Sequence, residues 1–144
     1  MDRPVFETLE KVSAMPTFSL LGASGYLAVF LIAVTIALPY YMRRRGIPLR
    51  PHYLIGYAIL VLAWTHSLTA MYAKTMSRTS VIGINAAMAA LMLITVQVGL
   101  GQALAATRGA RGKLTRFHFG VMLGIVVLVA AHLLLNGALL HGRL

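Results

Sequence analysis

Phe117 to Leu140 reads FHFGVMLGIVVLVAAHLLLNGALL, an unbroken run without Asp, Glu, Lys or Arg. About 20 consecutive apolar residues are enough to cross the hydrocarbon layer of a bilayer as an α-helix. Three further uncharged runs of similar length lie upstream, over residues 17–42, 53–73 and 79–107. They lack the alternating pattern of membrane-spanning strands and are much longer than such strands. The sequence therefore predicts an all-α membrane protein whose four transmembrane helices form an up-down-up-down bundle.

Composition agrees with a membrane protein, because 59% of the residues are hydrophobic and only 11% are charged. A soluble domain carries roughly a quarter charged residues. We predict three parts: an outer N-terminal segment over residues 1–16, a membrane domain over residues 17–140 and a short tail over residues 141–144. The first part is either a short interfacial helix or a frayed terminus. His141 lies in the tail and is expected to be solvated.

The formal net charge of +10 comes from basic residues at the ends of the apolar runs. Two of the connecting loops hold most of them: Arg43, Arg44, Arg45, Arg50, Arg108, Arg111, Lys113 and Arg116. Basic residues collect in the cytoplasmic loops of membrane proteins, so this charge does not indicate nucleic-acid binding. We predict that these two loops are cytoplasmic and that both termini lie outside, in a bacterial or archaeal cytoplasmic membrane.

The same two loops resemble each other in sequence. Residues 45–53 read RGIPLRPHY and residues 111–119 read RGKLTRFHF, so that Arg45 aligns with Arg111 and His52 aligns with His118. Internal repeats often relate the structural halves of a membrane protein. The similarity predicts that the bundle is built from two repeated helix hairpins, and two intervening crossings make the repeats run in the same direction.

Four histidines lie within the repeats. His52 and His66 form a His-x13-His motif, as do His118 and His132. This spacing falls about 40° short of four helical turns, so each pair occupies one face of its helix with roughly 21 Å between its members. Because the second and fourth helices run in the same direction, we expect His52 opposite His118 at one depth and His66 opposite His132 at another.

Facing pairs of imidazoles are the arrangement that bis-histidine haem iron requires. The chain has no cysteine, which excludes thiolate sites and covalently attached c-type haem. No carboxylate lies within the apolar runs, which makes a zinc site or a proton relay less favourable. The sequence therefore predicts two b-type haems whose iron is bound by His52, His118, His66 and His132. A different metal or proton pathway, or purely structural histidines, are the alternatives.

Two arginines lie close to the inner histidines of the predicted pairs. Arg50 and Arg116 each come two residues before a histidine. Guanidinium groups bind carboxylates in bidentate fashion, so these two residues are candidates for contact with haem propionates. The competing explanation is that basic loops serve only to orient the helices.

Paired His-x13-His motifs on the second and fourth helices resemble the dihaem core of cytochrome b from bc1 and b6f complexes. They also resemble the transmembrane domain of ferric reductases and NADPH oxidases. The resemblance covers residues 17–140 but depends mainly on the four histidines. It implies that His52 and His118 bind an inner haem and that His66 and His132 bind an outer one. The quinol-site motif of bc-type cytochrome b and the flavin and nicotinamide domains of the reductases are not found, so neither family's substrate site is transferred.

Two functions are compatible with this pattern. The first is a b-type dihaem cytochrome that transfers electrons across a membrane, as a subunit of a larger redox complex linked to quinone or quinol. The second is a stand-alone quinol-linked or ferric-reductase-like oxidoreductase, with Gln97, Gln102 and Asn136 as candidate quinone contacts. Interhelical hydrogen bonding explains these amides equally well. A transporter or an assembly factor without haem is a third alternative.

Overall fold

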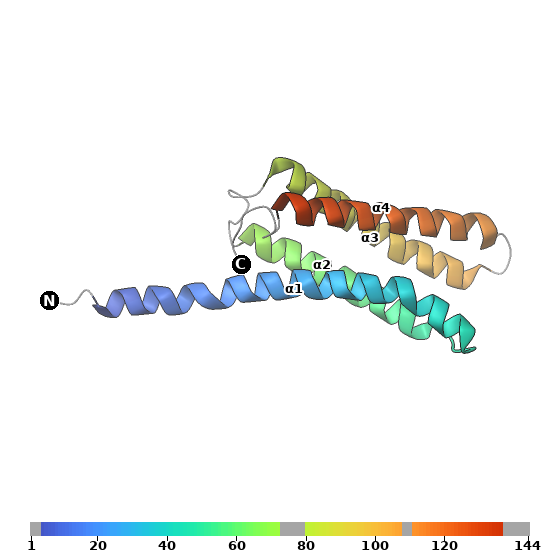
Figure 1. Ribbon diagram of the computed structural model, residues 1–144, viewed down its shortest axis with the longest axis horizontal. Helices are drawn as coiled ribbons and strands as arrows, with labels where there is room; N and C mark the ends of the chain where they lie inside the picture. The colour runs from blue at the N-terminus through green and yellow to red at the C-terminus, as the bar shows by residue number, and fades with distance from the viewer. Residues whose placement is uncertain (1–3, 73–79, 108–110, 137–144) are drawn as a thin grey trace.

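The computed structural model describes residues 4–72, 80–107 and 111–136, and over residues 4–21 it describes the backbone alone. Almost all of this part of the chain is helical, in the elements α1 (Pro4–Arg44), α2 (Arg50–Tyr72), α3 (Val81–Ala106) and α4 (Arg111–Asn136). Figure 1 shows the four helices lying roughly side by side. The prediction of an all-α protein with four long apolar helices is confirmed.

Every helix includes a segment long and apolar enough to cross a membrane: Gly22–Arg44, Arg50–Tyr72, Val81–Ala106 and Arg111–Asn136. Large apolar side chains, such as Phe30, Leu54 and Val127, are exposed on these segments. An exposed apolar surface of this extent is unfavourable in water and is a mark of membrane contact. The helices therefore belong to a protein that associates with membrane lipid.

The first helix is the longest of the four. α1 is continuous for 41 residues, passing Pro16 and Pro39. In Figure 1 the N-terminal part of α1 (blue) projects beyond the other three helices. The backbone thus shows no break at the predicted boundary after residue 16, and the predicted tail, residues 141–144, lies outside the described residues.

Gly46 ends α1 in a Schellman motif. It has a φ of 65°, a conformation that side chains with a Cβ disfavour. The Ile47 amide donates to the Met42 carbonyl at 3.0 Å and the Gly46 amide donates to the Arg43 carbonyl at 3.3 Å, which is the paired bonding of this motif. Pro48 follows and cannot continue the helix.

The similar loops differ in backbone structure at their Arg-Gly dipeptides. Gly46 follows the end of α1, whereas Gly112 is the second residue of α4. The later part of the motif is helical in both copies, because Arg50 begins α2 and Arg116 lies within α4. The sequence similarity of the loops therefore corresponds to similar structure only from these arginines onward.

α1 packs mainly against α2, and α3 packs mainly against α4, while α2 and α3 join the two hairpins. The buried core cluster consists of Ile59, Ile94, Val121 and Ile125. Partly buried side chains pack around this cluster, among them Ile55, Ala63 and Val129. The alignment that matches His52 with His118 also matches core positions of α2 and α4: Ile55 with Val121, Ile59 with Ile125, and Ala63 with Val129.

Candidate functional site

The histidines of α2 lie on the face of the helix that forms the core. His52, Ile55, Ile59, Ala63 and His66 follow one another at intervals of three or four residues, the spacing of a single helical face. The equivalent residues of α4 are His118, Val121, Ile125, Val129 and His132. On each helix a histidine therefore lies at either end of the apolar stripe that packs in the core.

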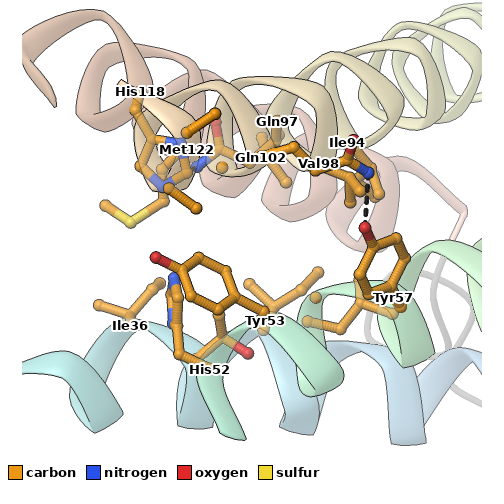
Figure 2. A pocket seen from close by; sticks show the side chains of 18 residues that line it. Ile36, His52, Tyr53, Tyr57, Ile94, Gln97, Val98, Gln102, His118 and Met122 are labelled. Carbon is orange, nitrogen blue, oxygen red and sulfur yellow. Dashed lines mark hydrogen bonds between the residues drawn. The ribbon is translucent and has the colours of Figure 1, made fainter. Parts of the chain in front are cut away.

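His52 and His118 line one cavity between the two hairpins. The cavity has a volume of about 550 Å³, within the range of roughly 300–1,000 Å³ that is usual for small-molecule and cofactor pockets. All four helices contribute to its wall, which is largely apolar. In Figure 2 His52 enters from the α1–α2 side and His118 from the α3–α4 side. The structure thus brings the predicted inner pair together in one space.

Three buried polar atoms in this wall have no hydrogen-bond partner among the described residues: His52 Nδ1, His118 Nδ1 and Gln97 Oε1. Buried polar atoms are nearly always hydrogen-bonded, so each such exception needs an explanation. Two imidazole rings on opposite walls of one largely apolar cavity fit a flat cofactor that is bound through imidazoles. His118 Nε2 lies 3.2 Å from Gln97 Nε2, so a ligand that binds this nitrogen must displace the Gln97 amide.

His66 packs against α1. Its Nδ1 lies 3.2 Å from Ser24 Oγ, and a Cβ placed on Gly25 would lie 3.0 Å from its Cε1. Only a glycine leaves the imidazole in this position without a shift of its neighbours. A hydrogen bond at Nδ1 is the usual way in which a metal-binding histidine is oriented.

His132 packs against the N-terminal end of α3. Its Nδ1 lies 3.0 Å from the carbonyl oxygen of Gly83. A carbonyl oxygen only accepts, so a hydrogen bond here requires the ring proton on Nδ1, which leaves the lone pair on Nε2. Neither His66 nor His132 is among the described residues that line the cavity of the inner pair, and their pairing with each other stays a prediction.

Arg50 and Arg116 are exposed, on the N-terminal parts of α2 and α4. Neither arginine is among the described residues that line the cavity of His52 and His118. Two other arginines near these loops contact the protein itself: Arg44 lies over the Tyr40 ring and Arg111 Nε donates to the Thr107 carbonyl. Propionate contact by Arg50 or Arg116 stays a prediction.

The three candidate quinone-binding amides lie at two different places. Gln97 and Gln102 line the inner cavity, where Gln102 Nε2 donates to the Tyr57 hydroxyl (Figure 2). Asn136 is far along α4 and accepts a hydrogen bond from the Ser80 amide at 2.8 Å. Only the two glutamines are therefore placed beside the inner histidine pair.

Sequence reasoning missed several residues that line the cavity or hold the outer histidines in place: Ser24, Tyr57, Ser80 and Gly83. Ser80 carried a signal, since a serine directly before an apolar run is a typical helix N-cap. The others had none, because their roles depend on how the helices pack. Within the described residues, no three His, Cys, Asp or Glu side chains gather closely enough to hold a metal ion.

Comparison with known proteins returned no relative: no protein-family model, no curated protein and no solved structure matches the chain. The resemblance to dihaem cytochromes accordingly depends on the histidine pattern alone.

Proposed function

We propose that this chain is a b-type dihaem cytochrome that transfers electrons across a membrane, as the membrane subunit of a larger redox complex. The observation that supports it most is the position of His52 and His118 on opposite walls of one apolar cavity. Haem, when bound, supplies an iron atom that takes up and gives up a single electron. The role of the chain is to bind the macrocycle through imidazole nitrogens, exclude water and fix the depth at which the iron lies.

The second haem is assigned to His66 and His132. Both residues have Nδ1 contacts within their own hairpins, to Ser24 Oγ and to the Gly83 carbonyl oxygen. In this arrangement Nε2 of His132 carries the lone pair that a metal needs. The level of these residues is about 21 Å from the inner pair along the helix axes, as the His-x13-His spacing requires.

We further propose that the helices cross the membrane in up-down-up-down order and that the two hairpins are repeats. In support, core positions of α2 recur in α4 under the same alignment as the histidines, including Ile59 and Ile125. The arginine-rich loops are assigned to the cytoplasmic side of a bacterial or archaeal membrane, with both termini outside. Arg50 and Arg116 are then placed on the side where the propionates of the inner haem emerge.

A quinol-linked oxidoreductase is the second candidate function. It is favoured by the polar groups beside His118, where Gln97 has a buried amide oxygen without a partner among the described residues and Gln102 bonds Tyr57. Quinones are bound by such hydrogen-bonding groups in largely apolar pockets. In this alternative the chain itself would oxidise quinol, instead of receiving electrons from another subunit.

Purification from cells supplied with haem tests the proposal. We expect two haems per chain, sharp absorption bands after reduction and no loss of haem in His141→Ala, which changes a histidine outside the four. Reconstitution into vesicles should then allow an external reductant to reduce an internal acceptor. Colourless protein, or a transfer rate equal to that of empty vesicles, would contradict the proposed function.

A further inference from the structure

A closed circuit of contacts connects the N-terminal end of α3 to the C-terminal end of α4. Asn136 Oδ1 accepts from the Ser80 amide at 2.8 Å, and Ser80 Oγ accepts from the Gly83 amide at 3.4 Å. The Gly83 carbonyl oxygen then accepts from His132 Nδ1 at 3.0 Å. His132 and Asn136 are separated by one helical turn, so the circuit closes on α4.

Only glycine fits at position 83, in the centre of the circuit. Gly83 is buried, and a Cβ on it would overlap the carboxamide of Asn136. The carboxamide therefore lies directly on the backbone of α3. This close approach brings the Gly83 carbonyl oxygen within reach of the imidazole.

The circuit also bears on the position of the imidazole proton. Asn136 Nδ2 lies 3.3 Å from His132 Nδ1, and its orientation is set by the bond from the Ser80 amide to Oδ1. Nδ2 is a donor, whereas the Gly83 oxygen is an acceptor, so the two contacts of Nδ1 call for opposite tautomers. The contact with the Gly83 oxygen is the shorter one, at 3.0 Å, and it favours a proton on Nδ1 and a lone pair on Nε2.

His118 of the inner pair has no such arrangement. Its Nδ1 is buried without a hydrogen-bond partner among the described residues, and its Nε2 lies beside Gln97. The backbone of α3 thus orients His132, while a side chain that can rotate contacts His118. This difference between His118 and His132 suggests that a specific residue holds His132 against the backbone of α3.

We propose that Asn136 is the positioning residue of His132: by clamping Ser80 and Gly83 of α3 onto α4, it holds the imidazole as the Nδ1–H tautomer with Nε2 directed away from α3. The clamp itself is independent of the proposed function, and only the reason for holding Nε2 ready depends on it. A hydrogen bond from Nδ1–H to a carbonyl increases the basicity of Nε2 and strengthens it as a metal ligand.

Nitrogen NMR of the full chain, labelled with ¹⁵N-histidine and kept free of haem in lipid nanodiscs, tests the clamp. We expect the His132 ring to be protonated at Nδ1 in the unchanged protein and to become a mixture of tautomers in Asn136→Leu. Asn136→Asp keeps an acceptor for the Ser80 amide and replaces the Nδ2 donor beside His132 Nδ1 with a carboxylate oxygen, so it should give a single Nδ1–H tautomer. The matched control is Gln97→Leu, which should change the ring signals of His118 and leave those of His132 unchanged.

Haem-loaded protein gives a second measurement, which also covers the case in which Asn136→Leu folds poorly without haem. Asn136→Leu should raise the reduction potential of one haem and leave that of the other haem unchanged within error. Asn136→Asp should return the first potential to its original value. A His132 ring protonated at Nε2 in the unchanged protein, or an Nδ1–H tautomer that persists in Asn136→Leu, would overturn the proposal. If the tautomers behave as expected but no haem binds, the clamp holds and the proposed function fails.

Discussion

Ile59 on α2 and Ile125 on α4 are buried in the same cluster, and each lies midway between the two histidines of its own helix. At about 1.5 Å per residue, the centre of this core is roughly 10 Å from either histidine level. The core therefore lies between the two histidine levels, and both isoleucines also line the inner cavity. Substitutions at its centre and substitutions at its ends should have different effects.

Ile125→Ala should lower the free energy of unfolding by about 2–5 kcal/mol, because it leaves a cavity between helices that lipid cannot fill. Denaturation by sodium dodecyl sulfate, followed by circular dichroism, measures this loss. Val127→Ala is the control, since Val127 is 59% exposed on the same helix and its truncation should cost less than about 0.5 kcal/mol. Equal effects of the two substitutions would show that Ile125 is not in the core.

Gly25→Ala should disturb the outer level alone. The added Cβ would lie 3.0 Å from His66 Cε1, so the imidazole has to move. Overpacking of this kind costs about 1–3 kcal/mol, which corresponds to roughly 5- to 150-fold weaker haem binding at this level. Gly22→Ala is the matched control, because a Cβ at Gly22 would meet nothing within 4 Å. Haemin titration of the haem-free protein compares them, and identical titrations would argue against a ligand role for His66.

Gly101→Leu should block the inner level. Gly101 lines the cavity, and a Cβ there already lies 3.8 Å from His118 Cε1, so a leucine side chain occupies space between the hairpins. We expect loss of one haem per chain, read from the reduced-minus-oxidised spectrum. Gly99→Leu adds the same side chain where a Cβ meets nothing within 4 Å and should retain both haems. Two haems in Gly101→Leu would contradict the assignment of this cavity.

Gln97→Leu should leave both haems in place. The variant protein should bind the inner haem at least as tightly as the unchanged protein does. The substitution removes the contact of 3.2 Å at His118 Nε2 and the unpartnered amide oxygen with it. Haemin titration measures the affinity. If the substitution instead slows reduction by a quinol analogue at least tenfold while haem binding is unchanged, the quinol-linked alternative gains support.

The helices were predictable because their apolar runs are long and free of charge, and the length of a membrane crossing is fixed. The shared face of His52 and His66 was predictable for a similar reason, since the His-x13-His spacing nearly completes four turns. The start of α2 at Arg50 was not predictable from hydropathy, because a search for apolar runs leaves out arginine. The first turn of a helix nevertheless accepts arginine, and proline is favoured there, as Pro51 is in α2.

The partners of the histidines could not be read from the sequence. Ser24 meets His66, and Gly83 meets His132, only because α1 and α3 present these particular faces to α2 and α4. Such contacts depend on helix rotation and side-chain rotamers, and periodicity specifies neither. The two Arg-Gly dipeptides show that identical residues can also adopt different structures. Gly46 follows the end of α1, whereas Gly112 lies at the start of α4.

The most direct test of the paired histidines is a count of haem in single and double variants, with reduced spectra that distinguish the two haems. His52→Ala, His118→Ala and the double variant should each retain one haem with the same spectrum, because both residues bind the same iron. His66→Ala and His132→Ala should retain the other one. Loss of different haems from His52→Ala and His118→Ala, or no haem in the unchanged protein, would contradict the account.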